Sequence, residues 1–165
     1  MKYYLILILF FFNLGFSVSR DIGKMCCEDS FSSPDLSIMD ATDIYRFAYD
    51  SLVSKNYTEA EVYFKAFIGE YPKDPLASNA YYWLGETYYI QKTFQLAAIS
   101  FARGYKKFPK GNKAIDNLFK LAVTFLHLDK KEDACAVFIK LKAEFPNAPK
   151  RISNRAKEYI RRARC

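Results

Sequence analysis

Apolar residues recur at helical spacing along most of the chain after residue 40. In seven stretches they stand at i, i+3, i+4 and i+7, which places them on one side of an α-helix. The stretches come as three pairs and a final single helix. The first helices of the pairs cover about 41–55, 75–92 and 113–129, the second helices about 58–71, 95–108 and 131–145, and the last helix about 149–163. The pattern predicts an all-α chain.

The three pairs are copies of one unit with a period of 37 residues. Five positions keep this spacing through all three copies: a large apolar residue, a small residue directly after it, an alanine, a phenylalanine and an aromatic–proline pair. These positions are Phe47, Leu84 and Leu121; Ala48, Gly85 and Ala122; Ala60, Ala97 and Ala134; Phe64, Phe101 and Phe138; and Tyr71-Pro72, Phe108-Pro109 and Phe145-Pro146. Such agreement indicates an internal repeat.

Local signals mark the ends of the predicted helices. Thr58-Glu59-Ala60-Glu61 has the form of a capping box and predicts the start of a second helix. Asp74-Pro75 and Asn147-Ala148-Pro149 combine a capping residue with an early proline, and predict the next helix starts. Because proline cannot continue a helix, Pro72, Pro109 and Pro146 end the second helices.

This arrangement of large and small residues, with Ala-xxx-Phe in the second helix and a closing proline, resembles the tetratricopeptide repeat. The resemblance accounts for 34 of every 37 residues and implies units at 41–74, 78–111 and 115–148. It implies a short right-handed solenoid of three helix-turn-helix repeats. The small residues, Gly85 among them, lie where two helices approach closely, and residues 149–165 form a basic C-terminal capping helix. Stacking three units buries apolar faces that one unit alone leaves exposed.

The N-terminal residues have the pattern of an export signal. Lys2 precedes an apolar run from Leu5 to Leu14, and Ser17-Val18-Ser19 forms a small-x-small site. This predicts a signal peptide at 1–19 that is cleaved after Ser19. Retention as an anchor is the alternative, although the run is shorter than the ~20 residues of a spanning helix. Residues 20–40 are polar and predict a flexible leader.

The net charge of +7 is concentrated near the C-terminus. Residues 20–148 hold 17 basic and 17 acidic residues, whereas residues 149–165 hold seven basic residues and one acid. The basic tail, Arg151, Arg155, Arg161 and Arg162 among its members, is either a solvated helix face or a contact for an anionic partner. Nucleic acid is not expected as the partner of an exported protein.

The sequence offers no catalytic or metal-binding constellation. His127 is the only histidine and has no companion at metal-ligand spacing, so neither a metal nor a cofactor is predicted. We find no nucleophile–base set and no phosphate-binding glycine loop, and expect no enzyme activity. Cys135 lies on an apolar helix face and is expected as a buried thiol. The sequence leaves open how Cys26, Cys27, Cys135 and Cys165 pair.

The stretch YPKDPLASNAYYWLGETYY narrows the resemblance to one family. With the three repeats and the basic tail, it resembles the C-terminal domain of the periplasmic Tol-Pal system proteins, the YbgF/CpoB family. The residues that carry the resemblance are Tyr71, Pro72, Pro75, Asn79, Ala80, Tyr82, Trp83, Leu84, Gly85 and Glu86. Outer-membrane assembly lipoproteins of the BamD type have related linkers and are the alternative, although the lipobox and additional repeats of that type are missing.

The resemblance implies a periplasmic, non-catalytic adaptor. Members of the family bind TolA and help to coordinate peptidoglycan synthesis with outer-membrane constriction during cell division. Partners would therefore be TolA-like or peptidoglycan-synthesis proteins, with at most peripheral membrane contact. The family's N-terminal coiled coil has no counterpart in residues 20–40, which leaves the oligomeric state open.

A partner is expected in the groove lined by the first helices. Helix geometry places nine residues there: Tyr45, Tyr49, Asn79, Tyr82, Glu86, Tyr89, Asp116, Phe119 and Val123. Tyrosine gives a large contact area together with a hydroxyl, which suits a binding surface. The tyrosines and acids favour a segment with apolar and basic side chains over one that ends in a carboxylate. Tyr81, Trp83, Leu84 and Tyr88 are expected to pack inside.

Overall fold

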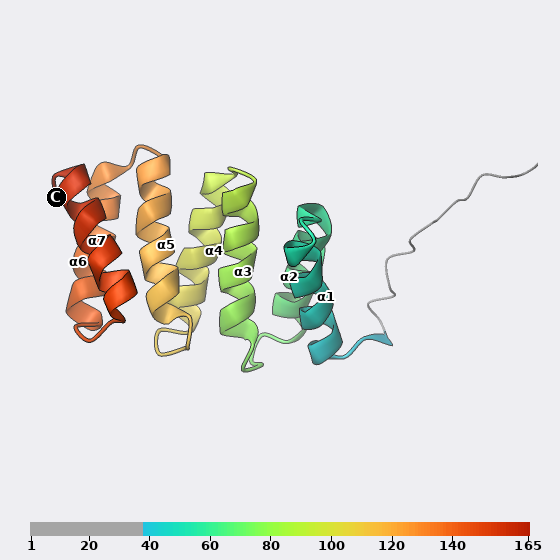
Figure 1. Cartoon of the computed structure of the whole chain (residues 1–165). Helices are drawn as coiled ribbons and strands as arrows, with labels where there is room; N and C mark the ends of the chain where they lie inside the picture. The colour runs from blue at the N-terminus through green and yellow to red at the C-terminus, as the bar shows by residue number, and fades with distance from the viewer. Residues whose placement is uncertain (1–37) are drawn as a thin grey trace, which may run out of the picture. The chain divides into compact units, whose positions relative to one another are not determined.

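The computed structural model describes residues 38–165, and these residues form seven helices without a strand (Figure 1). The helices are α1 (Ala41–Val53), α2 (Tyr57–Glu70), α3 (Ala77–Ile90), α4 (Phe94–Lys107), α5 (Ala114–His127), α6 (Lys131–Glu144) and α7 (Lys150–Ala163). The predicted signal peptide, residues 20–37 of the predicted leader, Cys26 and Cys27 lie outside the described residues. None of the helices in the described range is long and apolar enough to span a membrane.

All seven predicted helices are confirmed, with ends that differ by a few residues. The predicted capping box is wrong, because α2 already begins at Tyr57 and no side chain caps it. The Glu59 carboxylate instead accepts hydrogen bonds from Asn56 Nδ2 and Ser51 Oγ, both at 2.8 Å. Asp74 precedes α3 and accepts the Leu76 N–H at 2.7 Å, so it fixes the turn before that helix.

The repeat positions occupy equivalent places in the core. The alanine and phenylalanine of each second helix are fully buried in all three units. Gly85 lies against the ring of Phe101, and a Cβ atom built on it would stand 2.4 Å from Phe101 Cε1. Ala48 and Ala122, at the same register, are also fully buried. The small position therefore marks close helix packing, as the sequence predicts.

A left-handed residue joins the two helices of each unit. Lys55, Lys92 and Asp129 have φ values of 65°, 61° and 57° and lie 37 residues apart. In each unit the N–H of the next residue donates to the carbonyl five residues before it, as from Thr93 to Tyr88 at 3.0 Å. This is the hydrogen bond of a Schellman motif, which ends a helix. The three units therefore share the backbone conformation of this turn as well as the repeated residues.

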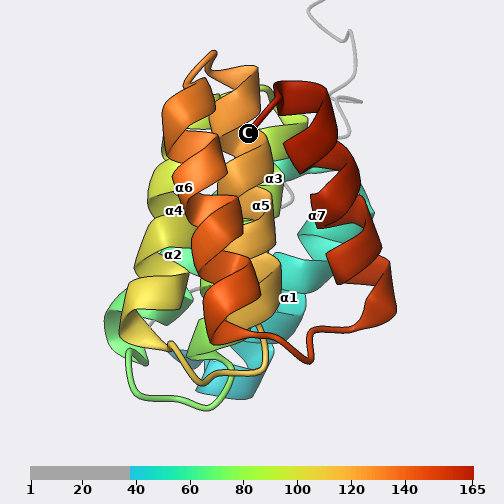
Figure 2. The same ribbon diagram turned by 90° about the vertical axis from the view of Figure 1, so that its left-hand side faces the viewer.

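The helices stand in two rows. Figure 1 shows α1, α3, α5 and α7 in front of α2, α4 and α6. One apolar cluster extends from α1 through α4 to Leu121 of α5, and a second joins α5, α6 and α7. Figure 2 shows the end of the stack, where α7 stands beside α5 and the connection from α6 enters its lower end. The helix α7 therefore follows the row of first helices.

The helix α7 does not repeat the burial pattern of the first helices, since Arg155, 37 residues after the buried Leu118, is exposed. Tyr159 stands 37 residues after Ala122, where the three units have Ala or Gly. Its ring stacks on Phe138 with centroids 6.0 Å apart and meets the edge of Phe119 at 6.0 Å. The Tyr159 ring therefore faces α5 and α6 of the third unit.

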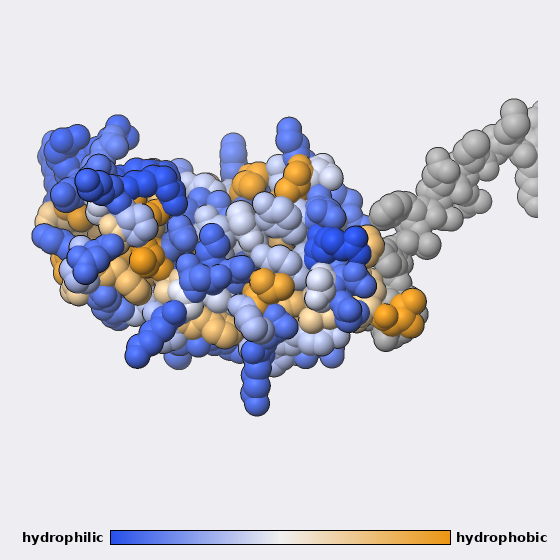
Figure 3. All heavy atoms as spheres, turned by 60° about the horizontal axis from the view of Figure 1, so that its bottom comes forward, coloured by the Kyte–Doolittle hydropathy of each residue, from blue (hydrophilic) through white to orange (hydrophobic). Residues whose placement is uncertain are grey.

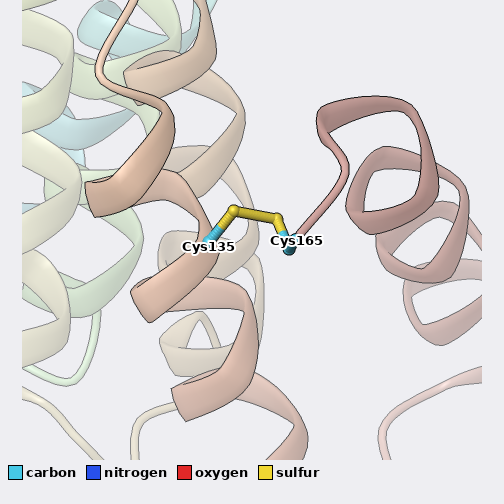
Figure 4. Close-up of a disulfide and its surroundings, with 2 residues drawn as sticks. All are labelled: Cys135 and Cys165. Atoms are coloured by element: carbon cyan, nitrogen blue, oxygen red, sulfur yellow. A yellow bond between two sulfur atoms is a disulfide. The ribbon is translucent and has the colours of Figure 1, made fainter.

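The expectation of a free buried thiol at Cys135 is wrong. Cys135 is half-buried in α6 and forms a disulfide with Cys165, which follows α7 (Figure 4). The two residues are 30 positions apart and their Cα atoms lie 5.5 Å apart. The sequence could not give this pairing, because it depends on how α7 folds back along α6.

Candidate functional site

The first helices of the three units present one continuous surface, which we call the first-helix face. The surface consists of ten residues from α1, α3, α5 and the residue that precedes α5: Tyr45, Tyr49, Asn79, Tyr82, Trp83, Glu86, Tyr89, Lys113, Asp116 and Lys120. All of these side chains are partly or fully accessible to solvent. Their periodic spacing on the three helices explains why the sequence could place most of them.

Aromatic contacts connect the first two units across this face. The Tyr49 ring of α1 meets Trp83 of α3 edge-on at 5.2 Å, and Trp83 meets Tyr82 at 4.9 Å. Burial raises the pKa of the Tyr45 hydroxyl, whereas Trp83 and Asn79 beside it act in the opposite sense. Trp83 was expected to pack inside, but it is half-buried and belongs to the face. Tyr81 and Tyr88, also expected inside, are buried as predicted.

An ion pair connects the second and third units. The Lys120 ammonium of α5 lies 2.7 Å from the Glu86 carboxylate of α3 and 3.9 Å from the centroid of the Tyr89 ring. Burial raises the pKa of the Glu86 carboxyl, and the charge of Lys120 opposes this effect. Burial also raises the pKa of the Tyr82 hydroxyl, as do the nearby Glu86 and Asp116 carboxylates. The face is therefore partly desolvated.

Two residues of the predicted groove are not available on this face. Phe119 and Val123 are 2% and 3% exposed because α7 covers them. The periodicity of α5 shows that these residues are apolar on a common side, but it cannot show whether solvent or a later helix lies there. The other seven predicted residues do lie on the first-helix face, and their contact with a partner stays a prediction.

The expected charge of the face is also wrong, because lysines balance its acids. Lys113 lies over the rings of Tyr82 and Trp83 at 4.8 Å and 5.5 Å, and 3.8 Å from the Asp116 carboxylate. With Lys120, the face has two cations against Glu86 and Asp116. The signal was present in the sequence, since residues 113, 116 and 120 follow one helical stripe.

The basic tail divides into two pairs. Arg151 lies 3.6 Å from the Asp116 carboxylate, and Arg155 lies 4.9 Å from the centroid of the Phe119 ring. Arg161 and Arg162 lie in the last turn of α7, where Arg162 forms an ion pair with Glu158. Figure 3 shows a dense blue, hydrophilic surface at the end of the stack that carries α7. Arg151 and Arg155, two of the four predicted tail residues, therefore lie against α5 in the row of first helices.

His127 is placed for packing. Its ring stacks on Phe94 at 4.7 Å, and its Nε2 lies 2.7 Å from the Tyr89 hydroxyl. Among residues 38–165, no three His, Cys, Asp or Glu side chains are grouped so that they could hold a metal ion. The first-helix face thus combines aromatic rings with paired charges.

Two family models of known repeats match the helical part of the chain. Both describe the tetratricopeptide repeat (TPR), one matching residues 45–112 and the other residues 116–148. The chain carries tetratricopeptide repeats. The first match spans the first two TPR units, and the second spans the third unit. No curated protein matches the chain.

Solved structures with a similar fold include other TPR-like proteins. One is the Yersinia enterocolitica type III secretion chaperone SycD in complex with a peptide of the translocator YopD, at a TM-score of 0.67 and 21% identity over 77% of this chain and 95% of that chain. Another is the N-terminal domain of stress-induced protein-1 from C. elegans, at a TM-score of 0.62 and 14% identity over 72% and 93% of the two chains. These likenesses show the fold.

Proposed function

We propose that this TPR protein is a non-catalytic adaptor that binds a protein partner on its first-helix face. The observation that carries the proposal is the continuity of this face from Tyr45 to Lys120 across all three units. Half-buried tyrosines and a tryptophan, held by one another and by ion pairs, lose little conformational freedom when a partner binds. A solved neighbour, SycD, holds a peptide of YopD, which supports a peptide segment as the ligand.

We further propose that the adaptor works in the periplasm as part of the Tol-Pal system. The N-terminal export pattern with cleavage after Ser19 and the stretch YPKDPLASNAYYWLGETYY support this assignment. In that role the chain would bind TolA-like or peptidoglycan-synthesis proteins. It would thereby help to coordinate wall synthesis with outer-membrane constriction during cell division.

A pull-down from envelope extracts tests both parts of the proposal. The wild-type chain is expected to recover a TolA-like or peptidoglycan-synthesis protein. The Tyr82→Ala/Tyr89→Ala variant is expected to lose it, since an aromatic hot spot contributes about 2 kcal/mol or more to binding. Circular dichroism first establishes that the variant is folded.

A second double variant serves as the matched control. Val62 and Ile99 are about half exposed and lie on α2 and α4, away from the first-helix face. Val62→Ala/Ile99→Ala should therefore keep the partner. If the tyrosine variant folds and keeps every partner, the face is not the binding site. Recovery of outer-membrane assembly proteins in place of Tol-Pal proteins would replace the assigned role by the BamD-like one.

A further inference from the structure

The helix α7 is attached to the stack by few buried side chains. Only Ile152 and Ala156 of its 14 residues are buried, whereas α3 and α5 each bury eight. A cavity of about 260 Å³ lies between α6 and α7 and is lined in part by Phe145 and Ile160. Burial of apolar area is the main source of docking free energy. The packing of α7 is therefore weak compared with that of the repeat helices.

Beneath α7 lies an apolar surface that continues the first-helix face. Phe119 and Val123 of α5 and Phe138 and Leu141 of α6 are all buried in one cluster with α7. Asp116 stands at the edge of this surface and pairs with Arg151. We call this set the covered site: Asp116, Phe119, Val123, Phe138 and Leu141.

The way α7 lies on the covered site shows which ligand chemistry fits there. Its apolar side places Ile152, Ala156 and the Tyr159 ring against the phenylalanines. Its arginines lie where the site is complementary, Arg151 beside the Asp116 carboxylate and Arg155 over the Phe119 ring. A cation over an aromatic face and beside a carboxylate is stabilised by both. The site thus accepts an amphipathic helix with arginines on its edge.

A disulfide fastens the far end of α7. The connection of residues 145–149 ties the start of α7 to α6, and the Cys135–Cys165 bond ties its end to the first turns of α6 (Figure 4). A tethered helix competes with a free ligand at a high effective concentration. Because the connection holds one end of α7 and the disulfide holds the other, α7 competes more strongly with a free ligand than a helix tethered at one end does.

We propose that the covered site is a docking site for a basic amphipathic helix of a partner protein, and that the Cys135–Cys165 disulfide keeps α7 in it. A dithiol reductant opens the site: it transfers two electrons and two protons to the disulfide, leaves two cysteine thiols and becomes a disulfide itself. The released α7 can then be displaced by the partner helix. The inference deepens the proposed adaptor function, on which it rests, because the covered site extends the first-helix face.

A labelled synthetic peptide with the sequence of residues 150–163 serves as the test ligand. It is titrated against the full-length chain carrying Ile152→Asp, which weakens docking of the chain's own α7. We expect the peptide to bind at least about tenfold more tightly after reduction with dithiothreitol than before, because the disulfide then no longer holds α7 on the covered site. The same peptide with Ile152→Asp should not bind either form. Equal binding before and after reduction would overturn the proposal.

Cysteine variants show whether the response of peptide binding to the reductant comes from the Cys135–Cys165 disulfide. Adding Cys135→Ser/Cys165→Ser should give the tight binding without reductant, and adding Cys26→Ser/Cys27→Ser should leave the response to reductant intact. A response that persists without Cys135 and Cys165 would contradict the proposal. So would a loss of helical circular dichroism on reduction that exceeds the contribution of the 14 residues of α7. Tyr49→Ala, a change in the first-helix face on α1, should not affect peptide binding, because Tyr49 packs on Trp83 of α3 and lies outside the cluster that contains the covered site. The peptide experiment and the pull-down can therefore fail independently.

Discussion

Gly85 shows how strongly a single residue can be constrained by a neighbouring helix. An added Cβ atom would lie within 2.4–2.8 Å of three atoms of the Phe101 ring, which is itself fully buried. Such a contact forces the ring or the helix backbone to move. The register with Ala48 and Ala122 predicts a small residue here, but the structure shows that only glycine fits without movement.

We expect Gly85→Ala to lower the free energy of unfolding by about 1–3 kcal/mol, the usual cost of overpacking a core. Urea unfolding followed by circular dichroism measures the change. Gly69→Ala is the matched control, because nothing lies within 4 Å of a Cβ built on Gly69. There the better helix propensity of alanine should raise stability by up to about 1 kcal/mol. Equal effects of the two substitutions would show that Phe101 does not restrict Gly85.

At the scale of the element, the turn between the two helices of a unit is the least expected feature. A left-handed residue after a helix is usually glycine or asparagine, yet this chain uses Lys55, Lys92 and Asp129. The sequence therefore carries no glycine signal for these turns. The helices themselves follow from apolar periodicity, and their ends after α2, α4 and α6 follow from the prolines.

Replacing Lys92 by glycine should stabilise the second repeat. The φ of 61° at Lys92 is unfavourable for a side chain, so Lys92→Gly is expected to raise the free energy of unfolding by roughly 0.5–1 kcal/mol. Thermal and urea unfolding measure the gain. Gln91→Gly, one residue earlier at a φ of –74°, is the control and should be neutral or destabilising. A loss of stability in Lys92→Gly would contradict the argument.

At the scale of the whole molecule, Glu86 of α3 and Lys120 of α5 link the second and third repeats. Burial raises the pKa of the Glu86 carboxyl above its ordinary value of 4.5. Between 4.5 and the raised pKa, the folded chain thus binds more protons than the unfolded chain. The contribution of Glu86 to the free energy of unfolding is present at low pH and is lost as pH rises through this window.

We expect Glu86→Gln to remove this part of the pH dependence, measured by urea unfolding between pH 4.5 and 7. Glu61→Gln is the control. Burial tends to raise the pKa of Glu61, but hydrogen bonds from Lys65 and Tyr88 outweigh burial and lower it. Its contribution is constant above pH 4.5 and is lost only at lower pH. If the free energy of unfolding depends on pH in the same way in the wild type and in Glu86→Gln, Glu86 is not the source of this pH dependence.

The sequence was sufficient to predict the repeat architecture and the last helix, but not the contacts that the last helix makes. Five repeated positions predict three helix pairs, because each position recurs in an equivalent environment. The covering of Phe119 and Val123 by α7 and the Cys135–Cys165 bond depend on contacts outside the repeat. Periodicity also cannot tell which of Tyr82 and Trp83 is the more exposed. Both residues lie at the boundary between the buried side and the exposed side of α3.

The helix α7 has a consequence for attempts to lengthen the array. Engineers extend repeat proteins by inserting further copies of the consensus unit before a cap. A copy added after α7 would have to pack on a helix whose exposed side is basic, since Arg155, Lys157 and Arg161 are all exposed. New units must therefore be inserted before residue 149. The charge of this one helix sets the direction in which the array can grow.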